Sequence, residues 1–179
     1  HAPLFHPAMR FVGPVRKAMG IKTFFNILGP LLNPVQVTKQ LTGVYNEETF
    51  EVYEALFQAT GGDFGILYAL DGYDEISLTS DTKIFDKSGE YIYSAEELGF
   101  KNIEPENIFG GHKKEESAVI FKNILEGNGT TEQNSVVLAN AAMALKNTGK
   151  YGDYSASLLL AKESLESGKA LQSLKNILN

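Results

Sequence analysis

The chain contains no cysteine among its 179 residues and only three histidines. Without cysteine it can form no disulfide, no thiolate metal site and no cysteine nucleophile. His1 is the first residue, and the two remaining histidines, His6 and His112, support neither a zinc cluster nor a Ser-His-Asp arrangement. These absences exclude several common forms of covalent and zinc-dependent catalysis.

Long apolar runs are also absent, since the sequence has no stretch of 18 apolar residues, no signal-like segment and no lipidation motif. We therefore expect a cytoplasmic protein that does not act at membranes. The chain is 43% hydrophobic and 21% charged, which is typical of a globular protein. Its length favours a single domain over residues 1–179.

Acidic residues are missing from the first 46 positions, which carry five bases. The net charge of −6 therefore hides an asymmetry, because the remaining 11 bases face 22 acids in residues 47–179. Such an acidic remainder repels a polyanion, so we expect no nucleic-acid partner. A small anionic ligand at the basic end fits this charge distribution better.

The spacing of apolar residues predicts an α/β fold. A helix is expected over residues 7–19, with Pro14 inside it and Gly20 ending it. A strand at 39–45, a helix at 47–60 and a strand at 64–70 then form a βαβ unit, whose last strand is almost wholly apolar. Further along we expect a hairpin over 82–93 and four helices, which begin near 115, run over about 132–147 and 152–166, and end near 178.

Three carboxylates follow the predicted strand 64–70 in the stretch "LDGYDEIS", residues 70–77. Asp71, Asp74 and Glu75 are either part of a solvated turn or ligands for a hard metal ion. Mg²⁺ prefers oxygen ligands and commonly bridges one or two carboxylates to substrate phosphates. A loop after a strand of an α/β sheet is also a common position for ligand binding.

Arg16 lies on the predicted helix 7–19, close to the turn-rich apolar segment 21–34. Arginine can hold a carboxylate or phosphate through two parallel hydrogen bonds, but a solvent-facing helix charge is an equally simple interpretation. His6 is likewise either a capping residue or a proton carrier. The glycines of "ATGGDF", residues 59–64, leave a helix and open a strand, so we interpret them as a helix end and not as a phosphate loop.

Two motifs resemble anthranilate phosphoribosyltransferase, an enzyme family of tryptophan biosynthesis. The segment "HPAMRFVGPVRKAMGIKTFFNILGPLLNP", residues 6–34, is similar to the signature of that family, and "DGYDEIS" resembles its acidic metal-binding motif. The tail segments "NSVVLANAAMAL" and "SLLLAKESLESGKAL" resemble its last helices. The resemblance thus covers essentially the whole chain.

The resemblance implies the C-terminal α/β domain of the nucleoside phosphorylase-like, class III phosphoribosyltransferase fold, incomplete, with a mixed sheet flanked by helices. It implies transfer of the phosphoribosyl group of phosphoribosyl pyrophosphate to anthranilate, with release of pyrophosphate. By position, Arg16 would hold the anthranilate carboxylate, His6 and Pro30 would line its channel, and Asp74 and Glu75 would bind Mg²⁺. No general base is implied, since the aromatic amine is already neutral, and the full-length protein is expected to be a homodimer.

The family is about twice as long as this chain, and its glycine-rich phosphate loop and Lys-His-Gly-Asn segment have no counterpart here. We therefore expect a C-terminal fragment that is inactive by itself. Two alternatives remain open from the sequence. One is a pyrimidine nucleoside phosphorylase with the same architecture, and the other is a non-catalytic relative that binds nucleic acid.

Overall fold

The structure, a computed structural model, describes residues 9–20, 25–32 and 37–178. The chain divides into two compact units, His1–Thr38 and Lys39–Asn179. The single domain expected over residues 1–179 stays a prediction. In the described part of the chain, no helix is both long and apolar enough to cross a membrane.

The first unit contains the short helices α2 (Met9–Met19), α3 (Phe25–Leu28) and the 3₁₀ helix η1 (Gly29–Leu31). The helix predicted over 7–19 is confirmed from residue 9 onward, with Pro14 inside it. Gly20 adopts a left-handed φ of 63°, and its N–H donates to the carbonyl of Arg16 at 3.2 Å. Glycine adopts this conformation without strain, which is why the helix ends there.

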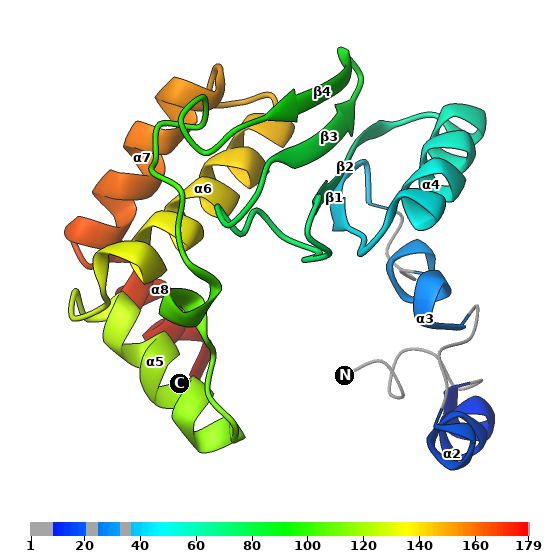
Figure 1. Cartoon of the computed structure of the whole chain (residues 1–179), viewed down its shortest axis with the longest axis horizontal. Coiled ribbons are helices and arrows are strands. Elements are labelled where there is room, and N and C mark those ends of the chain that lie inside the picture. Colours follow the sequence, from blue (N-terminus) through cyan, green and yellow to red (C-terminus); the bar gives the residue numbers. More distant parts are fainter. Residues whose placement is uncertain (1–8, 21–24, 33–36, 179) are drawn as a thin grey trace. The chain divides into compact units, whose positions relative to one another are not determined.

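The second unit is built on a four-stranded mixed sheet (Figure 1). Its strands lie in the order β1 (Lys39–Gly43), β2 (Asp63–Ala69), β3 (Thr82–Asp86) and β4 (Gly89–Tyr93). β1 and β2 run parallel to each other, whereas β3 runs antiparallel to both of its neighbours, β2 and β4. The predicted βαβ unit, hairpin and mixed sheet are therefore confirmed.

The crossover helix α4 (Glu47–Thr60) has clear end signals. The side chain of Asn46 accepts a hydrogen bond from the N–H of Thr49 at 2.9 Å, which satisfies one free amide of the first turn. At the other end the N–H of Gly61 donates to the carbonyl of Phe57 at 2.9 Å. The glycines at 61 and 62 thus end a helix, as the sequence predicted.

Aromatic side chains fix α4 to one face of the sheet. The ring of Phe57 stacks on Phe64 with centroids 4.5 Å apart, and Phe50 meets Tyr68 edge to face at 5.6 Å. Phe64 and Tyr68 are four residues apart on β2, so their side chains point to the same face of the sheet. Aromatic pairs in these geometries stabilise a contact beyond the area that they bury.

The opposite face of the sheet is covered by helices from the second half of the chain (Figure 1). Leu67 of β2 and Ile84 of β3 share one apolar cluster with Ala139 and Met143. After the 3₁₀ helix η2 (Pro105–Ile108), the helices are α5 (Lys114–Leu125), α6 (Thr131–Asn147), α7 (Tyr154–Glu166) and α8 (Lys169–Leu178). All four helices predicted for this half are confirmed, and α6 contacts both β1 and β2.

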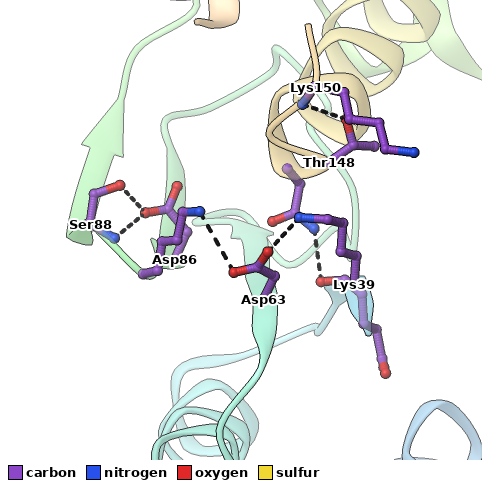
Figure 2. Close-up of polar contacts among 9 residues, drawn as sticks. Lys39, Asp63, Asp86, Ser88, Thr148 and Lys150 are labelled. Atoms are coloured by element: carbon purple, nitrogen blue, oxygen red, sulfur yellow. Dashed lines mark hydrogen bonds and ion pairs between the residues drawn. The ribbon is translucent and has the colours of Figure 1, made fainter. Parts of the chain in front are cut away.

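A polar cluster closes the end of the sheet where β1 and β2 begin (Figure 2). Lys39 pairs with Asp63, the first residue of β2. Asp86 accepts hydrogen bonds from the N–H and hydroxyl of Ser88 at 2.8 and 2.6 Å, and it pairs with Lys146 of α6 at 2.6 Å. The carboxyl ends of β1 and β2 lie at the other end of the sheet.

Candidate functional site

The acidic loop, residues 70–81, leaves the carboxyl end of β2 and returns to β3. Its base is closed by main-chain hydrogen bonds, since Leu70 donates to the carbonyl of Asp81 and Ala69 donates to that of Tyr73, each at 2.9 Å. A ligand of an open α/β sheet commonly binds beyond the carboxyl ends of its strands. The position of the loop therefore agrees with a binding site.

Asp71 differs from Asp74 and Glu75 because both of its carboxylate oxygens accept hydrogen bonds within the loop. The Thr79 hydroxyl donates to one oxygen at 2.5 Å and the Ser80 hydroxyl donates to the other at 2.9 Å. The N–H of Asp71 in turn donates to the Ser80 hydroxyl at 3.2 Å. Asp71 thus ties the two limbs of the loop together, and this use is structural.

Asp74 and Glu75 lie side by side in the sequence at the tip of the loop, and both side chains are exposed. The main chain of Asp74 lies against Gly43, the last residue of β1. Ile76, directly after the pair, is completely buried. The two exposed carboxylates are therefore carried on a main chain that lies against Gly43 between them and becomes buried directly after them.

The side chain of Asn140, in α6, binds the main chain of Ile76. The sequence did not indicate this role of Asn140. Its side-chain oxygen accepts from the N–H of Ile76 at 3.0 Å, and its NH₂ donates to the carbonyl of Ile76 at 2.8 Å. The one local signal is an Asn within the apolar part of a predicted helix. Gly43 was also missed, since nothing in the sequence indicates which segment approaches it.

A second polar group lies near the same end of the sheet. The Tyr68 hydroxyl donates to Glu47, and the Lys83 ammonium contacts Glu47 at 2.5 Å and Glu90 at 3.2 Å while lying 4.7 Å from the centroid of Phe50. Hydrogen bonds from Lys83 and then Tyr68 lower the pKa of Glu47, and burial together with Glu47 raises the pKa of Tyr68 to about 12. The Lys83 ammonium offsets one of the two carboxylate charges, and its two contacts join β3 to α4 and to β4.

The other sequence-predicted site residues belong to the first unit. Arg16 lies in the last turn of α2 and is half-buried, and Pro30 lies in η1 and is exposed. His6 lies outside the described residues. The structure thus brings Asp74 and Glu75 together in one loop, whereas Arg16 and Pro30 come from two separate short helices.

The donor set of the acidic loop suits a hard divalent cation. Two exposed carboxylates offer oxygen ligands, and Mg²⁺ usually completes its shell with water and substrate phosphate. Over residues 9–20, 25–32 and 37–178, no group of three or more His, Cys, Asp or Glu side chains could enclose a metal. The loop therefore fits an ion shared with a ligand and does not fit a closed protein cage.

A mixed sheet covered by helices, with an acidic loop at the end of a strand, defines the chain as an α/β protein. Residues 1–171 match the family model described as "Glycosyl transferase family, a/b domain". The chain belongs to this family.

Among its relatives, an anthranilate phosphoribosyltransferase from Flavobacterium johnsoniae is 50% identical over 99% of this chain and 53% of its own length. The Saccharomyces cerevisiae enzyme of that name, in complex with PRPP and Mg, aligns with a TM-score of 0.83 and 28% identity over 95% of this chain and 49% of its own. Its complex with 4-fluoroanthranilate gives a TM-score of 0.84 and 28% identity, with coverages of 97% and 52%. The predicted fold class is confirmed by this likeness.

The chain spans about half the length of the curated relatives it matches. Their shared name agrees with the anthranilate family resemblance of residues 6–34 and 71–77. It does not favour the pyrimidine nucleoside phosphorylase that the sequence left open.

Proposed function

We propose that this chain is the α/β part of an anthranilate phosphoribosyltransferase of tryptophan biosynthesis. The reaction joins the amine nitrogen of anthranilate to the ribose carbon of phosphoribosyl pyrophosphate. The bond from that carbon to pyrophosphate breaks, and the amine loses a proton to solvent. The observation that carries the proposal is the 50% identity with a relative of that name over nearly the whole chain, together with the exposed Asp74 and Glu75 pair.

In this proposal Asp74 and Glu75 hold Mg²⁺ through their carboxylate oxygens. The ion, when bound, offsets the negative charge that develops on the pyrophosphate oxygens as they leave. The Saccharomyces cerevisiae relative with PRPP and Mg supports the choice of ion. Asp71 is not assigned to the metal in this proposal, because the hydrogen bonds from Thr79 and Ser80 already give its two oxygens a role within the loop.

Arg16 is proposed to bind the anthranilate carboxylate, with His6 and Pro30 lining the channel for the aromatic ring. A half-buried guanidinium suits this role, because it can form two parallel hydrogen bonds that also orient the amine. The amine is neutral and nucleophilic without help, so catalysis depends on positioning and on charge stabilisation. No residue is assigned as a general base.

We propose in addition that the full-length protein is a cytoplasmic homodimer with no nucleic-acid partner. Phosphoribosyl pyrophosphate, which carries a phosphate and a pyrophosphate, does not cross a bilayer unaided, which favours a reaction in the compartment where that substrate is made. The exposed apolar side chains of Phe11, Val15 and Met19 on α2, spaced four residues apart, support a further protein contact there. Sedimentation of the full-length protein tests its oligomeric state.

The activity is tested in a fusion of the N-terminal half of the Flavobacterium johnsoniae relative to this chain. We expect the fusion to consume anthranilate only when phosphoribosyl pyrophosphate and Mg²⁺ are present. Asp74→Asn with Glu75→Gln is expected to lower kcat/KM about a hundredfold, and Glu106→Gln, an exposed carboxylate of η2, serves as the control. Arg16→Ala should raise KM for anthranilate, which separates its role from that of the acidic pair.

Activity with thymidine and phosphate in place of anthranilate would refute the proposed reaction. Full activity of the Asp74 and Glu75 double variant would refute the metal role.

A further inference from the structure

Asn140 occupies an unfavourable place for its residue type. It lies in the interior of α6, beside the buried core residues Ala139 and Ala142. Asparagine lowers helix stability by roughly 0.5 kcal/mol relative to alanine, and a polar amide at a core face is costly unless it is hydrogen-bonded. The reason that an asparagine is favourable here must therefore lie in contacts outside α6.

The contribution of Asn140 is a two-sided hold on the main chain of Ile76. Its oxygen accepts from the Ile76 N–H at 3.0 Å, and its NH₂ donates to the Ile76 carbonyl at 2.8 Å and to the carbonyl of Val136 at 2.9 Å. The amide thus acts on Ile76 as a neighbouring strand would, and both of its polar ends are used. The third bond fixes the amide to its own helix.

The hold acts one residue after the acidic pair. Before the pair, the carbonyl of Tyr73 accepts a hydrogen bond from the N–H of Ala69 at 2.9 Å. Between the two acidic residues, the carbonyl of Asp74 abuts Gly43 at the end of β1. Asp74 and Glu75 are therefore carried on a short piece of main chain between two fixed points, while their side chains remain exposed. Fixing this main chain during folding lowers the entropy that would otherwise be lost when an ion binds.

We propose that Asn140 is a positioning residue, which holds the Asp74 and Glu75 carboxylates in place for a divalent cation. This inference rests on the proposed metal role of the pair. Asn140 itself touches neither the ion nor the substrate. Its effect passes through the main chain of Ile76.

Asn147 offers a matched control on the same helix. It lies seven residues further along α6, on the same face, and its NH₂ donates to the carbonyl of Gln40 at 3.0 Å. Both asparagines thus tie α6 to the main chain of a distant segment. Asn147 acts at the start of β1, at the end of the sheet away from the acidic loop.

The test measures Mn²⁺ binding to the 179-residue chain from the electron paramagnetic resonance signal of the free ion, and stability from urea unfolding. Both Asn140→Ala and Asn147→Ala should lower stability, and Asn140→Ala should lower it more because it loses three hydrogen bonds and not one. Only Asn140→Ala should weaken Mn²⁺ binding, by about tenfold as for other outer residues of metal sites, and speed hydrogen exchange at the Ile76 amide. Asn140→Leu keeps the number and branching of the side-chain heavy atoms and should weaken binding in the same way if the alanine variant does not fold.

The outcomes separate the two proposals. Mn²⁺ binding that Asp74→Asn with Glu75→Gln abolishes but that both Asn140 variants leave unchanged overturns the positioning role alone. Mn²⁺ binding that does not depend on the acidic pair overturns the metal role, and the positioning role with it. An equal loss of affinity in Asn147→Ala shows general loosening of α6 and also overturns the positioning role.

Discussion

Gly43 and Asp74 touch through their main chains. A methyl group on the α-carbon of Gly43 would lie 1.7 Å from the carbonyl oxygen of Asp74. We expect Gly43→Ala to lower the free energy of unfolding by about 3 kcal/mol or more, since main-chain atoms cannot step aside as a flexible side chain does. Urea unfolding measures the loss, and the same variant should lower Mn²⁺ affinity.

Gly110→Ala is the control for this prediction. An added methyl at Gly110 meets nothing within 4 Å, so its stability should change by less than about 0.5 kcal/mol. If Gly43→Ala behaves like Gly110→Ala, the close approach of β1 to the acidic loop does not exist.

Leu78 combines a buried side chain with a left-handed φ of 61°, which leucine rarely adopts. Replacing it by alanine should cost about 2 to 5 kcal/mol because a buried side chain is lost. Glycine at this position should then be more stable than alanine by about 1 kcal/mol, because it relieves the left-handed strain. Thermal and urea unfolding of Leu78→Ala and Leu78→Gly show which of the two variants is more stable.

Leu67 supplies the matched pair for Leu78, since it is equally buried but lies within the regular strand β2. At this position the alanine variant should be more stable than the glycine variant, because glycine weakens a regular strand. If the glycine and alanine variants rank in the same order of stability at Leu67 and at Leu78, Leu78 does not carry the strain assigned to it.

The carboxylate of Asp86 should make the free energy of unfolding depend on pH. Burial by itself would raise the pKa of Asp86, but the Lys146 ammonium and the hydrogen bonds from Ser88 outweigh it and hold that pKa below its usual value. The unfolded chain then binds the proton more readily, so the stabilisation is complete above the unfolded pKa of about 4 and is lost as pH falls through the lower folded pKa. Asp86→Asn should remove about 1 to 3 kcal/mol at pH 7.

Chemical unfolding of the Asp86→Asn variant and the natural chain between pH 7 and pH 2 checks this. The difference in free energy of unfolding between the two proteins should become smaller as the Asp86 carboxylate of the natural chain is protonated. A gap that stays constant down to pH 2 would mean that the charge of Asp86 does not stabilise the fold.

The chain alone should form no phosphoribosyl anthranilate. It spans about half of the relatives it matches, and the family segments that grip the phosphoribosyl phosphates have no counterpart in its sequence. Anthranilate fluorescence, followed with phosphoribosyl pyrophosphate and Mg²⁺, should stay constant at any chain concentration. Turnover by the purified chain would show that it carries a complete site.

Local patterns in the sequence were sufficient for most of the second unit. The apolar run of β2, the capped helix α4 and the two glycines after it define a βαβ unit through short-range rules of periodicity and capping. The acidic pair could be found in the same way, since it directly follows a recognisable strand. The resemblance of residues 6–34 to a known family then named Arg16, His6 and Pro30.

Local patterns and the family resemblance were therefore enough to predict the elements, the family and the carboxylates that are available to a metal. The packed fold was needed to show that Asp71 is used within its own loop, that Gly43 lies against the peptide between Asp74 and Glu75, and that Asn140 holds the main chain after them. The reason is distance along the chain. Asn140 and Ile76 are 64 residues apart, and no periodicity or local propensity encodes a contact that forms only when α6 packs on the sheet.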